Sequence, residues 1–179
     1  MGSVPLHPAV VHIPLALAFL LPLFALGAGF MAWHGGSAGR RWIVVPVLAL
    51  LMFGSALVAS SAGEQDEERV ERVVPGAALE AHEEWGEAFV WSACGTLLVA
   101  LFGMAPGAVL RRGAIVATTV GSVAVASVAF QTGKLGGELV YEHGAADAHR
   151  PLTEPSRSAE EPPHTSVVES PLAEEHDED

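Results

Sequence analysis

The 179-residue sequence predicts an all-α membrane protein, a four-helix up-down transmembrane bundle with a disordered acidic C-terminal tail. Three observations predict this class. Four apolar runs of about 20 residues each have the length that crosses a hydrocarbon core of roughly 30 Å. The connections between the runs are short, so neighbouring helices must be antiparallel. The end of the chain is acidic and poor in large apolar residues. We therefore expect one transmembrane domain over residues 5–144 and a tail over residues 145–179.

The four runs are apolar on all sides, whereas a long helix of a soluble domain carries a polar stripe. They contain no Asp, Glu, Lys or Arg, and His12 is the polar exception in the first run. Trp33, Trp42 and Trp85 lie at run ends, where the amphipathic indole prefers the membrane interface. A signal peptide is disfavoured for the first run, because it lacks a basic start and is too long. The predicted spans are residues 10–32, 42–62, 88–110 and 113–133.

Four arginines predict the orientation of the bundle. Arg40 and Arg41 follow the first span, and Arg111 and Arg112 follow the third. Loops rich in Lys and Arg stay in the cytoplasm, so both pairs are predicted to lie inside. Both termini and the acidic connection over residues 64–87 then lie outside. We expect a multi-pass protein of the bacterial cytoplasmic (inner) membrane, with both termini on the periplasmic side.

The acidic charge of the chain is concentrated towards its end. The net charge is −12, and residues 150–179 hold nine acidic and two basic side chains. Such a chain lacks the basic surface that nucleic acid requires. The tail cannot bury enough apolar surface to offset the entropy of ordering, so we expect it to be disordered. Its histidines, His149, His164 and His176, either capture metal loosely or are incidental solvated side chains.

Four other histidines are predicted to gather at the outer side of the bundle. Counting about 20 residues along each span from its cytoplasmic end brings His12 and His82 to the same level. His7 and, if the last helix continues past Gly133, His143 lie further out. This predicts two tiers, with His12 and His82 facing the bundle interior. Single histidines at span ends can simply be capped by water or a carboxylate, but four on one side favour a shared function. Histidine is also an axial ligand of haem iron.

A seam of small residues follows the last span at helical spacing. Such a seam lets another helix, or a flat macrocycle, approach the backbone closely, and helix packing alone would also explain it. Gly86, one turn after His82, could make the same kind of room. The seam consists of Ser122, Ala126, Ala129, Gly133 and Gly136 or Gly137.

Many carboxylates surround the predicted histidine cluster, in residues 64–68, 80–87 and 138–142. They form either a solvated acidic cap or a set of acceptors for the free ring N–H of ligating histidines. Lys134, the only lysine, is expected to turn outward or to pair with Glu138 one turn later.

Several stretches resemble a bacterial family of four-helix membrane proteins without an assigned function. The opening, residues 6–14 (LHPAVVHIP), resembles the family's LHPxxVHFP pattern, although Ile13 stands where Phe is more usual. Residues 63–64 (GE), 82–87 (HEEWGE) and 136–144 (GGELVYEHG) are also similar. The resemblance covers residues 5–144. It implies the four-helix fold and haem binding through histidines, and so nominates His7, His12, His82 and His143 as ligands of haem iron. It implies no reaction.

Three functions are consistent with these features. The first is a b-type haem protein with one or two haems that transfers electrons or senses redox state near the outer membrane face, in contact with the bilayer and other membrane redox subunits. The second is a non-catalytic accessory subunit of a larger membrane complex. The third is a small transporter or a metal site that uses the outer cluster of His and Glu side chains. The lack of mid-membrane charges disfavours a proton or ion pathway across the bilayer. We find no hydrolase, kinase or dehydrogenase motif, so an enzyme is disfavoured.

Overall fold

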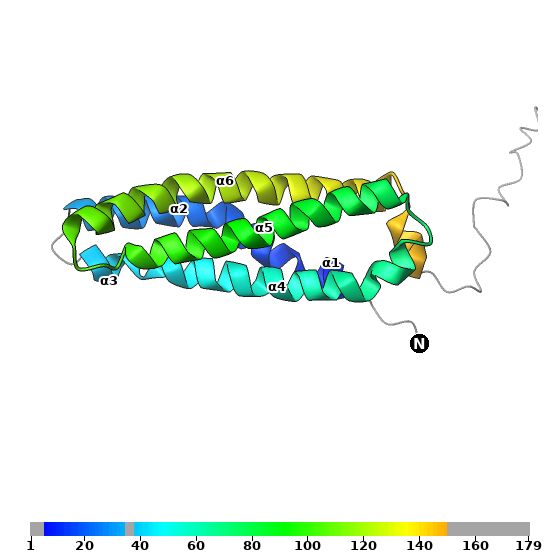
Figure 1. The fold of residues 1–179 in the computed structure, drawn as a ribbon, viewed down its shortest axis with the longest axis horizontal. Helices are drawn as coiled ribbons and strands as arrows, with labels where there is room; N and C mark the ends of the chain where they lie inside the picture. Colours follow the sequence, from blue (N-terminus) through cyan, green and yellow to red (C-terminus); the bar gives the residue numbers. More distant parts are fainter. Residues whose placement is uncertain (1–5, 35–37, 150–179) are drawn as a thin grey trace, which may run out of the picture.

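The chain folds as an all-helical bundle (Figure 1). The computed structural model describes residues 6–34 and 38–149, and these contain helices and no strands. Four helical stretches are long and apolar enough to cross a membrane: Leu6–His34, Arg40–Val70, Gly76–Phe102 and Ala108–Tyr141. The predicted fold class is thereby confirmed. The elements are α1 (Leu6–Val10), α2 (His12–His34), α3 (Ala38–Trp42), α4 (Val44–Val70), α5 (Gly76–Phe102), α6 (Ala108–Tyr141) and the 3-10 helix η1 (Ala145–His149).

The long helices form a closed ring in which α2 contacts α4 and α6, while α5 contacts the same two helices from the other side. Figure 1 shows α1, the α4–α5 connection and η1 at one end of the bundle, with α3 and the α5–α6 connection at the other. We call the first the histidine end, because it carries His7, His82 and His143. We call the second the arginine end, because it carries the pairs 40–41 and 111–112. The up-down topology therefore brings these three histidines to one end and the two arginine pairs to the other.

Alanines make up much of the bundle interior. Ala18, Ala25, Ala49, Ala93 and Ala129 are completely buried. Small interior side chains let helix backbones approach closely, which is how helices gain packing energy in a membrane. Large apolar side chains instead cover the outside of the bundle, where a membrane would solvate them.

Proline explains why the first span is broken. The helix is interrupted at Val11, between α1 and α2. Pro14 has no N–H to donate to the Val10 carbonyl four residues earlier, and its ring crowds that carbonyl. Helix α1 is therefore a separate five-residue segment that packs mainly on α4 rather than on α2.

Two other helix boundaries differ from the predicted spans. The third span was predicted to reach residue 110, but α5 ends at Phe102. The chain turns over residues 103–107, where Gly103, Pro106 and Gly107 interrupt the helix although hydropathy stays high. In contrast, α6 remains helical past Gly133 as far as Tyr141, as predicted. Gly144, at φ +71°, then turns the chain into η1.

The predicted tail begins inside folded structure. Residues 145–149 form η1, which contacts α4 and α6. Ala145 packs against a small apolar cluster of Val74, Leu79 and Leu139, so η1 and the α4–α5 connection together cover the histidine end. Residues 150–179, with His164 and His176, lie outside the described part of the chain.

The interfacial role predicted for Trp42 is wrong. Trp33 and Trp85 are exposed, but Trp42 is completely buried at the arginine end. Its indole N–H donates to the Ala100 carbonyl at 2.8 Å, which ties α3 to α5. Trp33 instead holds the guanidinium of Arg112 at 5.1 Å from the ring centroid. The Trp42 indole thus links α3 to α5 inside the bundle, whereas the Trp33 indole makes a cation–π contact with Arg112 at the bundle surface.

Gly103 is required where Trp42 packs. A Cβ on Gly103 would lie 2.6 Å from Cε2 of the Trp42 indole. We expect Gly103→Ala to lower the free energy of unfolding by about 1–3 kcal/mol, the usual cost of overpacking a core. Gly95→Ala, in the interior of α5 with nothing within 4 Å, should be neutral or stabilising. Thermal unfolding in detergent compares them, and equal midpoints would contradict this packing.

Candidate functional site: a histidine pair between α1 and α5

The histidine end brings two imidazoles from distant parts of the sequence together. His7 of α1 and His82 of α5 have ring centroids 6.2 Å apart and ring planes at 88°. Both side chains are partly buried. The break at Val11 allows α1 to lie against α4, and α4 packs on α5, so the contact results directly from the fold.

A backbone hydrogen bond orients the His7 ring. His7 Nδ1 lies 2.8 Å from the carbonyl oxygen of Ala59 in α4. A carbonyl can only accept, so Nδ1 must carry the hydrogen and donate it. In the neutral ring the lone pair is then on Nε2, which is free to bind a metal or accept a proton. In many metal sites a backbone carbonyl accepts the second ring N–H of a ligating histidine and so fixes its tautomer and orientation, and the Ala59 carbonyl is placed to do the same for His7.

His82 has an unsatisfied nitrogen. Its Nδ1 is buried and has no hydrogen-bond partner among residues 6–34 and 38–149. A buried polar atom left without a partner costs about 1–3 kcal/mol, so such atoms are rare in native proteins. Beside His7, the fold therefore keeps a partly buried imidazole with one ring nitrogen that no described protein group satisfies.

Two glycines make room for the imidazoles. A Cβ on Gly63 of α4 would lie 3.2 Å from His7 Nδ1, and a Cβ on Gly136 of α6 would lie 3.1 Å from His82 Cε1. Any larger residue would press on the rings. The neighbouring Gly137 and the predicted Gly86 have nothing within 4 Å. In the small-residue seam, Gly133 faces Leu15 of α2, so the seam serves helix packing there and the histidine pair only at Gly136.

The predicted tiers are wrong in their pairing. His12, expected to face the interior with His82, is exposed at the start of α2. His7, expected in the upper tier, is the residue that meets His82. His143 lies in the turn after α6, partly buried, and its backbone N–H donates to the Glu138 carbonyl at 3.1 Å. The structure thus brings together two of the four nominated histidines.

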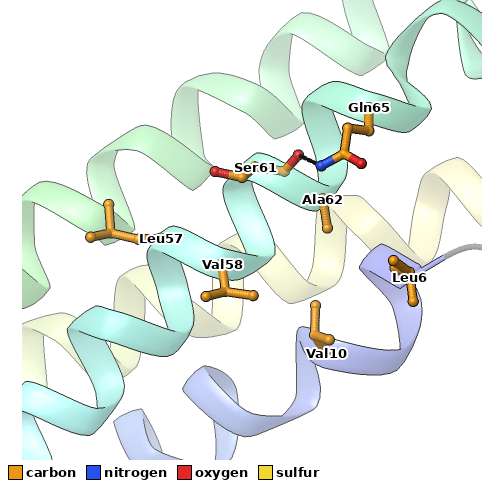
Figure 2. A pocket seen from close by; sticks show the side chains of 7 residues that line it. All are labelled: Leu6, Val10, Leu57, Val58, Ser61, Ala62 and Gln65. Carbon is orange, nitrogen blue, oxygen red and sulfur yellow. Dashed lines mark hydrogen bonds between the residues drawn. The ribbon is translucent and has the colours of Figure 1, made fainter.

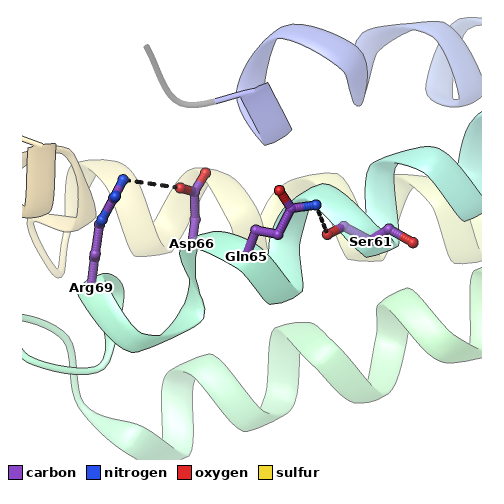
Figure 3. Close-up of polar contacts among 4 residues, drawn as sticks. All are labelled: Ser61, Gln65, Asp66 and Arg69. Atoms are coloured by element: carbon purple, nitrogen blue, oxygen red, sulfur yellow. Dashed lines mark hydrogen bonds and ion pairs between the residues drawn. The ribbon is translucent and has the colours of Figure 1, made fainter. Parts of the chain in front are cut away.

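Two carboxylates of the histidine end pair with cations. Lys134 contacts Glu138 at 3.0 Å, as predicted. Arg69 contacts Asp66 at 3.7 Å, next to a Gln65 side-chain amide that donates to the Ser61 carbonyl at 2.9 Å (Figure 3). The acceptor for the His7 ring is a backbone carbonyl rather than a predicted carboxylate. Within residues 6–34 and 38–149, no three His, Cys, Asp or Glu side chains form a metal-binding group.

The opening and closing motifs of the sequence therefore come together at one place in space. His7, Gly63, His82 and Gly136, each from a different stretch of the chain, surround one pair of imidazole rings. A family profile described as a predicted membrane protein, DUF2231, matches residues 3–149. The chain belongs to the DUF2231 family. The match covers α1 to η1, so the histidine pair lies entirely within the DUF2231 region.

Searches for similar proteins of curated function and for similar solved structures find no match. Membership of DUF2231 establishes a membrane protein family and leaves the activity open. The function must therefore be argued from the histidine end itself.

Proposed function

We propose that this DUF2231 protein binds haem b, which His7 and His82 would hold, and that the haem would supply electron transfer or redox sensing. The observation that supports the proposal is the imidazole pair, with ring centroids 6.2 Å apart. Imidazole is the commonest metal ligand among protein side chains, so two neighbouring rings could together hold one metal.

The residues around the pair fit such a group. The Ala59 carbonyl leaves Nε2 of His7 as the free donor atom, and His82 holds a buried Nδ1 without a hydrogen-bond partner in the described part of the chain. Gly63 and Gly136 place no side chain beside the rings. Iron held by two histidines has no open coordination position, which suits electron transfer more than oxygen chemistry.

His12 and His143 remain predicted haem ligands outside the His7–His82 pair. They lie near the same end of the bundle, and neither has a ring contact with another histidine among the described residues. The proposal also keeps the predicted location. The protein would lie in the bacterial inner membrane, with the histidine end facing the periplasm and the arginine pairs 40–41 and 111–112 facing the cytoplasm.

An oxidised-minus-reduced visible spectrum tests the proposal. The full-length protein would be expressed with haem precursor and purified in detergent. We expect a shifted Soret band and narrow α and β bands, the spectrum of low-spin iron with two histidines. A protein that shows no haem absorbance after haem has been added and the excess removed would overturn the proposal and favour the accessory-subunit function.

A further inference from the structure

The arginine end concentrates positive charge that the chain itself does not neutralise. It carries the arginine pairs 40–41 on α3 and 111–112 on α6, whereas residues 6–63 and 88–137 contain no Asp or Glu. In the part of the chain that the structure describes, the ion pairs between side chains lie at the histidine end. Four guanidinium charges therefore gather at one end of the bundle without a carboxylate partner.

The carboxylates of the chain are too distant to offset this charge. At the rise of an α-helix, Glu87 lies about 22 Å from the end of α5 at Phe102, and Glu64 lies about 30 Å from the start of α4 at Val44. Exposed charges are largely screened from one another beyond about 8 Å at physiological salt. The acidic residues 150–179 follow η1, which lies at the histidine end. The neutralising anion must therefore come from outside the chain.

Uncharged groups position the two arginines of α6. The Arg112 guanidinium lies over the Trp33 ring, 5.1 Å from its centroid, and Nη1 of Arg111 donates to the Ala105 carbonyl at 3.4 Å. Both contacts orient a guanidinium and leave its charge in place. Arg112 is also exposed, so its N–H groups can reach an anion. The planar fork of a guanidinium binds two phosphate oxygens at once, which a lysine ammonium does not do.

The neighbours of Arg112 place it at the level of lipid headgroups. Along α6, Val109 lies nearer the end of the bundle and is 88% exposed, while Val116 lies one turn deeper and is 52% exposed. Trp33 is half exposed, and an indole prefers the membrane interface. Exposed apolar surface continues along the outside of the bundle, for example around the groove between α1 and α4 (Figure 2). A phospholipid matches this arrangement, because it offers acyl chains to the valines and a phosphate to the guanidinium.

We propose that the arginine end binds an anionic phospholipid, with the lipid phosphate on Arg112 and the acyl chains beside Val116. Every phospholipid offers a phosphate, but a zwitterionic headgroup also brings its own cation and so leaves the net charge of this end unchanged. Phosphatidylglycerol and cardiolipin bring a net negative charge, which attracts basic side chains near the membrane surface. This site lies at the opposite end of the bundle from the proposed haem and does not depend on it.

Competition between two lipids tests the site. The immobilised full-length protein, in a neutral detergent, would be offered equal amounts of phosphatidylglycerol and phosphatidylcholine with the same acyl chains, and mass spectrometry would quantify the retained lipids. We expect phosphatidylglycerol to be retained in excess, and the excess to fall as salt is added, because salt screens exposed charges. A preference that does not respond to salt would overturn the site. Equal retention of both lipids would also overturn it and would favour an acidic protein partner.

Two variants with the same change of charge locate the lipid. Arg112→Gln and Arg72→Gln each remove one exposed arginine, but Arg72 lies in the α4–α5 connection at the histidine end. Arg112→Gln should lower the preference for phosphatidylglycerol about fivefold, equivalent to about 1 kcal/mol. Arg72→Gln should leave the preference unchanged. Equal preferences in the two variants would overturn the site at Arg112, and the salt dependence of the natural protein tests the proposal without any substitution.

Discussion

Replacing His82 by alanine is expected to remove the low-spin haem spectrum. His82 is the member of the ring pair whose buried Nδ1 has no hydrogen-bond partner among the described residues, so alanine removes one of the two proposed ligands. Loss of a mere outer partner of a metal ligand typically costs 10–100-fold in affinity, and loss of a ligand should cost at least about as much. His7→Ala should have the same effect. Haem titration followed by absorbance measures both.

His12→Ala is the matched control for these variants. His12 is exposed at the start of α2, so its removal should leave the haem between His7 and His82 in place. If two haems bind, His12→Ala and His143→Ala should remove at most the second. If His12→Ala abolished the haem spectrum and His7→Ala preserved it, the assignment of the haem to His7 and His82 would be contradicted. The predicted pairing of His12 with His82 would then be supported.

The histidine pairing could not be read from the sequence because counting residues gives height and not direction. The prediction correctly gathered His7, His82 and His143 at one end, since hydropathy and helix rise determine depth. His7 and His12 are five residues apart, however, and five helical residues leave about 140° between two side chains. Both could not face inward from one regular helix. The break at Val11 decides that His7 turns towards the interior.

Trp42 illustrates a second limit of the sequence. Tryptophans at span ends usually face the membrane interface, and hydropathy alone cannot distinguish Trp33 from Trp42. The difference arises because Gly103 ends α5 beside Trp42 and leaves space for a whole indole there. The helix of the third span also ends just before Gly103, although the apolar run continues to residue 110. The four spans follow from local composition, whereas the position of Trp42 depends on a contact between residues 61 positions apart.

The backbone contributes parts of the site that side-chain patterns do not reveal. The acceptor for His7 is the carbonyl of Ala59, an alanine within an ordinary apolar run. The motif glycines were visible in the sequence, but their roles were not. Gly136 and Gly137 are adjacent and chemically identical, and only the direction of each Cα–H bond separates them.

Gly136→Val is expected to separate the two imidazoles. The new Cβ would lie 3.1 Å from Cε1 of His82, and the two methyl groups beyond it would crowd the ring further. We expect the free energy of unfolding to fall by about 1–3 kcal/mol, because overpacking forces neighbouring side chains to move. The contact between the His7 and His82 rings should be lost, which nuclear Overhauser spectra of ring-labelled histidine would detect without haem.

Gly137→Val separates this steric effect from a change in helix propensity. Gly137 lies in the same turn of α6, and a Cβ there meets nothing within 4 Å. Valine forms helices better than glycine, so this variant should be as stable as the natural protein or slightly more stable. It should also keep the ring contact. If Gly136→Val retained both the ring contact and the stability of Gly137→Val, the His82 ring could not lie against α6 as the structure has it. The haem proposal would then lose the geometry that supports it.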